Sequence, residues 1–196
     1  MYGKVFTDNT PVWKPGINDF DNVKTLGLVN VDSPNYTGQV LDLVIVKNGQ
    51  EYRDRMFPIN PNSIRPRSLR DRNTGETREE SIQEATERTY GEFNSRVKHI
   101  FTNFMSEEEF ESVTADSFEA YINALTDKLP EDFDSKPGQV ILGYNNGGYL
   151  EMPRYMWITG HFFSINGQKD LTVSDKVKVH KVNSEATEKP TKPVEW

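Results

Sequence analysis

The chain of 196 residues is long enough for one ordinary domain that carries an insertion, or for two small domains. It contains no cysteine, which excludes a disulfide framework, a thiolate zinc site and a cysteine nucleophile. No apolar run approaches the roughly 18 residues needed to cross a bilayer, and the first residues lack the pattern of a secretory signal peptide. We therefore expect no membrane association and a cytoplasmic location.

The formal net charge of -7 is distributed unevenly along the chain. The segment from Lys47 to Arg78 contains eight basic and four acidic residues, a local charge of +4. Between Glu79 and Asp134, fifteen acidic residues face four basic ones, a local charge of -11. Phosphate binding needs clustered lysines and arginines, so the overall charge is against a general nucleic-acid coat. The basic segment is nevertheless compatible with a localised polyanion contact.

The first third of the chain has the alternating polarity of β-strands. Residues 23–31 alternate, and residues 39–47 (QVLDLVIVK) are the most strand-prone segment. Asn48-Gly49 follows at once, and this dipeptide between β-type runs predicts a tight hairpin turn. Residues 51–59 are then expected to form the returning strand.

A helical pattern follows a loop. Residues 60–75 contain two prolines and four arginines, which indicates a loop. Apolar residues at steps of three and four then predict a helix from about residue 79 to 105. Ser106-Glu107-Glu108-Glu109 fits a capping box that would begin a second helix. Asp116 is the expected N-cap of a third helix, which Pro130 would end.

The β pattern returns after Pro137. Residues 139–144 predict a strand, 145–148 a tight turn and 149–153 a further strand. Residues 157–163 fit either a strand or a packed loop, and residues 171–182 alternate like a strand. The order of strands, helices and strands is typical of an α+β, mainly β fold, in which a helical lobe interrupts a barrel.

We find no catalytic or metal-binding motif in the sequence. His99, His161 and His180 lack a second ligand at metal spacing, and His99 is expected to have a structural role, at the surface or half-buried in the helix. The glutamates at 107–111 could be imagined as a divalent site, but acids at a helix start usually interact with the helix dipole and stay solvated. We therefore expect no enzyme, no cofactor and no metal.

The remaining candidate residues suit contact with a polyanion. Arginine pairs with phosphate and stacks on bases, and aromatic rings stack on bases for roughly 1–3 kcal/mol each. The candidates are Arg53, Arg55, Arg65, Arg67, Arg70 and Arg72 with Tyr52 and Phe57, and in the second half Tyr144, Tyr149, Arg154, Tyr155 and Trp157. Two plainer alternatives stay open. The loop arginines could be solvated or paired with the acidic helices, and the rings could belong to the core or its rim.

Two segments carry a resemblance to a known family. Residues 13–23 contain Pro15-Gly16-Ile17 and Asn22-Val23, and residues 142–155 read LGYNNGGYLEMPRY. Together they resemble the opening and the late barrel segment of phage-encoded single-stranded DNA-binding proteins of the OB type. The pair stands in the family's order and brackets most of the chain.

The resemblance implies a five-stranded OB-fold barrel interrupted by an acidic helical lobe. The divisions would be 1–75 for the first barrel part with the basic loop, 76–135 for the helical insertion, 136–184 for the final barrel strands and 185–196 for a disordered tail. OB folds bind along strands two and three and the adjacent loops, which correspond here to residues 39–59 and the arginine loop. The tail departs from the family, because it has three acids and two lysines and keeps only a terminal aromatic, Trp196.

The implied function is binding of single-stranded DNA in phage replication or recombination, without a cofactor. Replication proteins would be partners through the acidic insert or the tail, and the oligomeric state stays open. An alternative is a phage virion structural or assembly protein that uses the barrel and the helical lobe for protein contacts. A third reading, an enzyme with a carboxylate metal site, has the least support.

Overall fold

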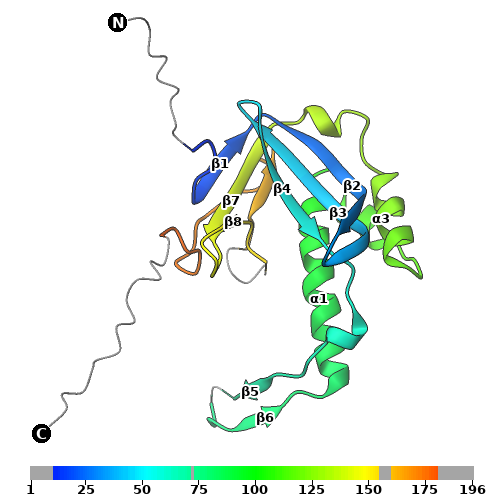
Figure 1. Ribbon diagram of the computed structural model, residues 1–196, viewed down its shortest axis with the longest axis vertical. Coiled ribbons are helices and arrows are strands. Elements are labelled where there is room, and N and C mark those ends of the chain that lie inside the picture. The colour runs from blue at the N-terminus through cyan, green and yellow to red at the C-terminus, as the bar shows by residue number, and fades with distance from the viewer. Residues whose placement is uncertain (1–10, 72, 155–159, 181–196) are drawn as a thin grey trace, which may run out of the picture.

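The computed structural model describes residues 11–71, 73–154 and 160–180. Within these residues the fold is α+β, with two antiparallel sheets joined at a corner and flanked by helices (Figure 1). The predicted tail at 185–196 lies outside the described residues.

The first sheet has the order β2-β3-β4, formed by Asn22–Ser33, Tyr36–Lys47 and Gln50–Met56. The predicted hairpin at Asn48-Gly49 is confirmed, and both turn residues have positive φ, 50° and 75°. A β-bulge between Val23 and Thr25 shifts the expected alternation, so that Val23 and then Leu26 face the core.

The second sheet is built around β7 (Gly138–Tyr144). One edge of β7 pairs with β1 (Gly16–Phe20), and the other edge pairs with β9 (Phe163–Ile165) and then β8 (Leu150–Glu151). Only one residue, Asp21, separates β1 from β2, and its backbone N–H donates to the Val46 carbonyl at 2.7 Å. The chain therefore passes from one sheet to the other without a loop.

The described strands do not close into a barrel. No strand pairing among them joins β4 to β8 or β9. A side-chain bond crosses this opening instead, since the Met152 backbone N–H donates to the Tyr52 hydroxyl at 2.9 Å. Among the described helices, none is both long and apolar enough to cross a membrane.

Three helices of the described chain, α1 (Ile82–Phe101), α2 (Glu107–Glu111) and α3 (Phe118–Thr126), contribute to the core. The helix residues that are fully buried against the sheets are Val97, Ile100, Phe101, Ile122 and Leu125. The Ser106 capping box is confirmed. The N-cap of α3 is Ser117 rather than Asp116, because the Ser117 hydroxyl accepts the Ala120 N–H.

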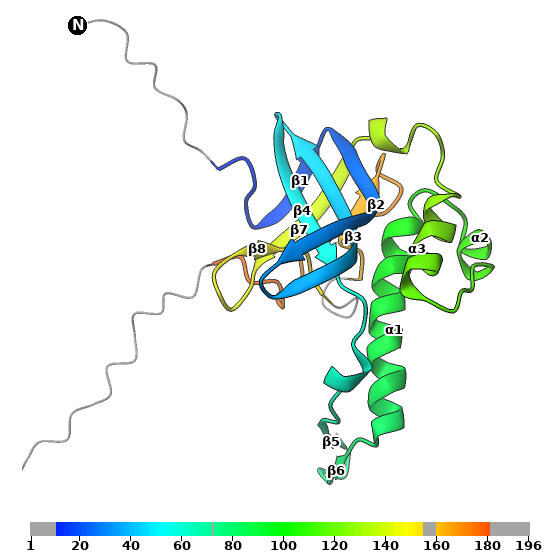
Figure 2. The same cartoon turned by 45° about the vertical axis from the view of Figure 1, so that its right-hand side comes forward.

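The predicted loop at 60–75 is partly wrong, because it contains half of a β-hairpin. A 3₁₀ turn (Pro61–Ser63) leads into β5 (Ser68–Arg70), which pairs with β6 (Thr77–Glu79). The N-terminal half of α1 and this hairpin extend together beyond the sheets (Figures 1 and 2). We call the described residues between 61 and 80 the arm. The buried carboxylate of Glu80, at the end of the arm, accepts a hydrogen bond from Arg88 Nε at 2.9 Å and so attaches the arm to α1.

The strand expected at 171–182 is wrong for its described part, residues 171–180, which forms turns and irregular backbone. The Val177 N–H donates to the Ser174 carbonyl, which closes a turn in the middle of the alternating segment. One bond ties this segment to the sheet, because the Tyr144 N–H donates to the Lys178 carbonyl at 2.7 Å. Of the expected segment 157–163, residues 157–159 lie outside the described part, and β9 begins at Phe163.

Two glycine substitutions are expected to change stability in opposite directions. A Cβ at Gly138 would lie 2.3 Å from the Ser164 carbonyl oxygen and 2.6 Å from the Phe20 ring, so Gly138→Ala should destabilise the fold by about 1–3 kcal/mol or more. A Cβ at Gly91 in α1 meets no atom within 4 Å, so Gly91→Ala should stabilise it by about 1 kcal/mol. Urea unfolding checks both variants: a stabilising effect of Gly138→Ala would contradict the packing described around β7, and a destabilising effect of Gly91→Ala would contradict the open space beside α1.

A buried ion pair joins α1 to β4. The Arg96 guanidinium donates from Nη2 to the Asp54 carboxylate at 2.8 Å, and the two side chains are mostly buried, 13% and 11% exposed. Burial raises the pKa of Asp54, and the charge of Arg96 opposes that rise. Arg96 Nε has no hydrogen-bond partner within the described residues, so its charge depends on Asp54 for compensation.

His99 is buried and connects two elements by hydrogen bonds, rather than lying at the surface or half-buried. Its Nε2 accepts the backbone N–H groups of Phe162 and Phe163, both at 3.2 Å, which anchors β9 to α1. Burial, with smaller contributions from the charges of Lys169 and His161, lowers the pKa of His99 to about 3. The structural role expected for this histidine is therefore confirmed, and its depth is corrected.

The low pKa of His99 predicts a pH dependence of stability. Between about pH 6.5 and 3 the unfolded chain binds a proton at this residue and the folded chain does not. The free energy of unfolding should therefore fall as pH drops through this window, by up to about 1.4 kcal/mol per pH unit. His99→Gln should flatten that part of the profile in denaturant titrations at several pH values. Equal slopes for both proteins would refute the assignment.

Candidate nucleic-acid interface

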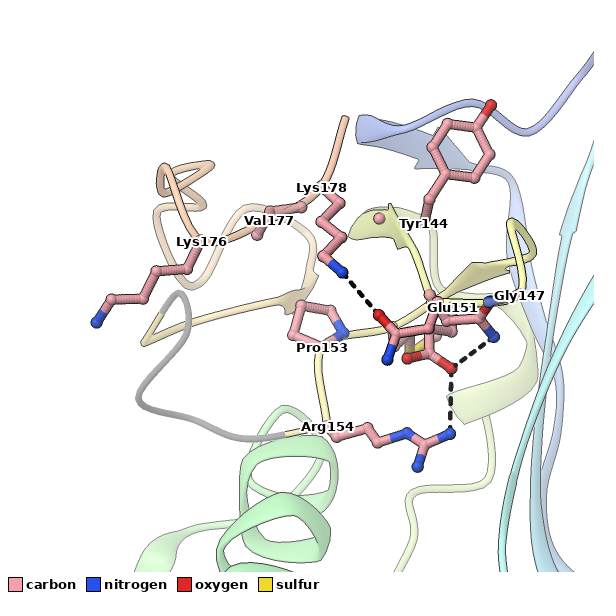
Figure 3. Close-up of a pocket in the computed structure, with 12 residues that line it drawn as sticks. Tyr144, Gly147, Glu151, Pro153, Arg154, Lys176, Val177 and Lys178 are labelled. Carbon is pink, nitrogen blue, oxygen red and sulfur yellow. Dashed lines mark hydrogen bonds and ion pairs between the residues drawn. The ribbon is translucent and has the colours of Figure 1, made fainter. Parts of the chain in front are cut away.

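A pocket of about 430 Å³ lies between the turn that links β7 to β8 and the later segment 176–178 (Figure 3). Its polar lining includes Tyr144, Asn145, Glu151, Arg154, Lys176 and Lys178. The apolar part of the wall comes from Met152, Pro153 and Val177. We call it the β7–β8 pocket.

Local hydrogen bonds form the rim of the β7–β8 pocket. The Asn145 side-chain oxygen accepts the backbone N–H groups of Gly147 and Tyr149, at 2.9 and 3.0 Å. Gly148 adopts a φ of +75°, which glycine accommodates without strain. Val177 packs on Gly143, where a Cβ would come within 2.8 Å of its side chain. The segment that carries the lysines is thereby held against β7.

Basic side chains exceed acidic ones at this pocket. Among the described lining residues there are three basic side chains, Arg154, Lys176 and Lys178, and one acidic side chain, Glu151. Lys178 Nζ donates to the Asn146 side chain at 2.7 Å, and Arg154 Nη2 lies 3.3 Å from a Glu151 oxygen. The local charge is therefore positive in a chain whose total is negative, which favours an anionic ligand here.

An exposed ring lies against the β7–β8 turn, next to a residue that lines the pocket. Tyr149 is 74% exposed, and its ring lies against Gly147, where a Cβ would be 3.1 Å from ring atom Cδ2. A large aromatic side chain left this open to solvent can stack on a base. Its neighbours in the predicted site, Tyr155 and Trp157, lie outside the described residues.

A second candidate surface, in which two arginines pair with two acids, lies on the outer face of β3 and β4. Arg53 and Arg55 point their Nε atoms toward Asp42, at 3.4 and 3.3 Å, and this carboxylate is only 2% exposed. Phe57 is 45% exposed and packs edge-to-face on Tyr36 with ring centroids 4.9 Å apart. Tyr36 and Asp42 were absent from the predicted site. Asp42 and Arg55 lie directly opposite each other in the β3–β4 pairing. This relation follows from the strand register, which is set by the position of the hairpin turn.

Tyr52 lies on the opposite face of β4 from those arginines. It is half-buried beside Trp13, with ring centroids 5.6 Å apart, and its hydroxyl accepts the Met152 N–H. Burial raises its pKa well above the ordinary value. The structure therefore places this predicted stacking ring in the seam between the two sheets.

The arginines of the predicted loop lie on the arm, apart from both surfaces. Arg65 donates to the carbonyls of Asn62 and Ile64, at 2.6 and 2.8 Å, and Arg67 lies 3.9 Å from Glu92. Arg70 has no ion-pair partner in the part of the chain that the structure describes. Arg72 lies outside that part. The predicted site is thus divided among the pocket, the strand face and the arm.

Sequence reasoning missed the two pocket lysines. Lys176 and Lys178 alternate with Val177 in a segment whose pattern indicates a strand, so their cluster with Arg154 was not visible. The pairing of Lys178 with Tyr144 joins residues far apart in the chain. The signal available in the sequence was the pair of lysines around one valine, after a motif already suspected of binding.

The acidic helix start has protein partners. Lys98 Nζ lies 3.0 Å from Glu107 and 2.7 Å from Glu111, and Glu109 completes the capping box with Ser106. In the described residues no group of three or more potential metal ligands comes together.

Comparison of the chain with protein-family models, with curated protein sequences and with solved structures finds no match.

Proposed function

We propose that the chain is a single-stranded DNA-binding protein of the phage OB type, and that the β7–β8 pocket is part of its contact surface. The observation that carries the proposal is that Arg154, Lys176 and Lys178 line one pocket, and that the exposed ring of Tyr149 lies against Gly147 of the same lining. A cationic groove with stacking rings is the general means of holding single strands without sequence preference. The host-cell cytoplasm would be the location.

The strand connections support the OB assignment within this proposal. A bent first strand, β1 with β2, continues into the hairpin β3–β4, and β7 returns to pair with β1. OB folds are five-stranded and partly open. On this reading the helices and the arm are inserted between β4 and β7, and the side-chain bond from Met152 to Tyr52 spans the opening.

The other predicted residues remain part of the proposal as additional contact surfaces. Arg53, Arg55 and Phe57 offer a strand face of the kind that OB folds use. The arm carries Arg70, which is exposed. The strongly acidic helical lobe would repel DNA, and its helices α2 and α3 lie away from β8 (Figure 2). It is therefore the surface we assign to replication partners.

Tyr149 provides the first test of the pocket. Replacing it with Ala should weaken binding of a labelled oligo-dT by about tenfold, since one stacked base contributes roughly 1–3 kcal/mol. The matched control is Tyr90→Ala, because Tyr90 is also exposed but lies on α1. Fluorescence anisotropy measures both variants. Equal affinities for the Tyr149 and Tyr90 variants would remove the pocket from the binding surface.

A virion structural or assembly protein is the second candidate. The exposed apolar side chains of Ile82 and Tyr90 on α1, 59% and 42% accessible, favour it because they offer a surface for protein contacts. This candidate predicts no salt-sensitive DNA ligand, whereas neutralised phosphates make affinity fall steeply with salt.

A further inference from the structure

One acidic residue, Glu151, lies beside three basic ones among the described residues that line the β7–β8 pocket. It belongs to β8, and its side chain is 30% exposed toward the pocket (Figure 3). A carboxylate here lowers the affinity of the pocket for phosphate, because it partly neutralises the basic side chains. Its presence in a DNA contact surface therefore calls for a different ligand group.

The two oxygens of the Glu151 carboxylate differ in their hydrogen bonding. Oε2 accepts from the Asn145 side-chain nitrogen at 3.1 Å and lies 3.3 Å from Arg154 Nη2. Within the described residues, no group donates to Oε1. The carboxylate is thus held in place through one oxygen, and the other keeps its capacity to accept a hydrogen bond.

We infer that the β7–β8 pocket takes up one base of the single strand and that Glu151 makes it prefer cytosine over thymine. The inference rests on the proposed function. The pocket, at about 430 Å³, lies in the size range of small-molecule sites, and Met152, Pro153 and Val177 supply apolar contact for a base. Lys176 and Lys178 would hold the flanking phosphates.

The hydrogen-bonding edges of the two pyrimidines explain the preference. Cytosine carries an N4 amino group that donates to a carboxylate, and its N3 accepts from a neighbouring donor. Glu151 and Arg154 offer that acceptor and that donor side by side. In the same pose thymine places its O4 carbonyl against the carboxylate lone pairs and its N3–H against the Arg154 donor, so both contacts are mismatched. The pocket therefore discriminates by an attractive contact with one base and a repulsive contact with the other.

A purely structural role for Glu151 gives a different result. If the carboxylate only orients Asn145 and Arg154, its neutralisation would change the affinity for every strand by the same factor. The ratio of the affinities for oligo-dC and oligo-dT separates the two roles, because general electrostatics cancels in that ratio.

The test compares labelled oligo-dC and oligo-dT of about 30 nucleotides, titrated with the full chain at low salt and slightly alkaline pH. We expect oligo-dC to bind about fivefold to tenfold more tightly, the size of one good base contact. Glu151→Gln should raise the affinity for oligo-dT, because an acid is removed, and should bring the dC-to-dT ratio to about one. Glu131→Gln, an exposed acid beyond α3, is the control and should leave the ratio unchanged.

Two results would overturn the inference, and they are distinguishable. A dC-to-dT ratio of about one in the unsubstituted protein, or one that Glu151→Gln leaves unchanged, would refute base selection while the DNA-binding function stands. Absence of binding to both strands at low salt would refute the proposed function itself. Thermal unfolding of Glu151→Gln alongside the unsubstituted protein shows that the near-isosteric variant is folded.

Discussion

Substituting Asp54 by Ala is expected to lower the free energy of unfolding by about 3–5 kcal/mol, because a buried charge would lose its partner. Arg96 donates to Asp54 at 2.8 Å, and its Nε has no other partner in the described chain. The pair joins α1 to the core face of β4. The helix that supports the arm would therefore also lose this polar attachment to β4. Urea unfolding followed by circular dichroism measures the change.

A control and a rescue make the Asp54 prediction specific. Glu51 lies on the same strand as Asp54 and forms an exposed ion pair with Lys24 of β2. Glu51→Ala removes the acid of that pair and should leave the unfolding midpoint nearly unchanged. The double variant Asp54→Leu with Arg96→Met should recover most of the lost stability, because apolar pairs of similar volume often replace buried ion pairs without loss. Asp54→Ala unfolding at the midpoint of the unsubstituted protein would contradict the buried pair.

Replacing Lys176 and Lys178 by Gln is expected to weaken oligo-dT binding by roughly one to two orders of magnitude at moderate salt. Both lysines line the β7–β8 pocket, where they would contact phosphates. Each phosphate contact to a single strand contributes about 0.7 to the slope of log K against log salt. The slope should therefore become shallower by about 1.4, measured by anisotropy titrations at several salt concentrations.

The control for the lysine variant has the same change in net charge. Lys128→Gln with Lys136→Gln removes two lysines from the segment between α3 and β7, and neither of them lines the β7–β8 pocket. This variant should bind oligo-dT with the affinity and salt slope of the unsubstituted protein. Equal losses in both double variants would mean that net charge, rather than the pocket, determines binding.

Elements with a local signal were predicted well from the sequence. Asn48-Gly49 specifies a turn in which both residues have positive φ, so the hairpin β3–β4 and its strand faces follow from a few residues. The Ser106 capping box likewise depends on residues three positions apart. The coarse α+β order of strands, helices and strands is confirmed, whereas closure into a barrel stays a proposal.

Features that depend on distant residues could not be predicted. The bulge at Lys24 is visible only in the pairing with β3, and it changes which side chains of β2 face the core. The arm depends on the contact of Glu80 with Arg88. The candidate site was only partly predicted: Tyr149 and Arg154 were among the predicted residues, and Lys176 and Lys178 were not. The alternation of the two lysines with Val177 indicates a strand and gives no sign of a binding site.

The most direct test of the account is an anisotropy titration of a labelled oligo-dT of about 30 nucleotides at low and moderate salt, with unlabelled duplex of the same length as competitor. We expect binding at low salt that weakens steeply as salt rises and that the duplex does not displace. Absence of binding at low salt, or displacement by duplex as effective as by single strand, would contradict the proposed function and make a protein-assembly role the leading explanation.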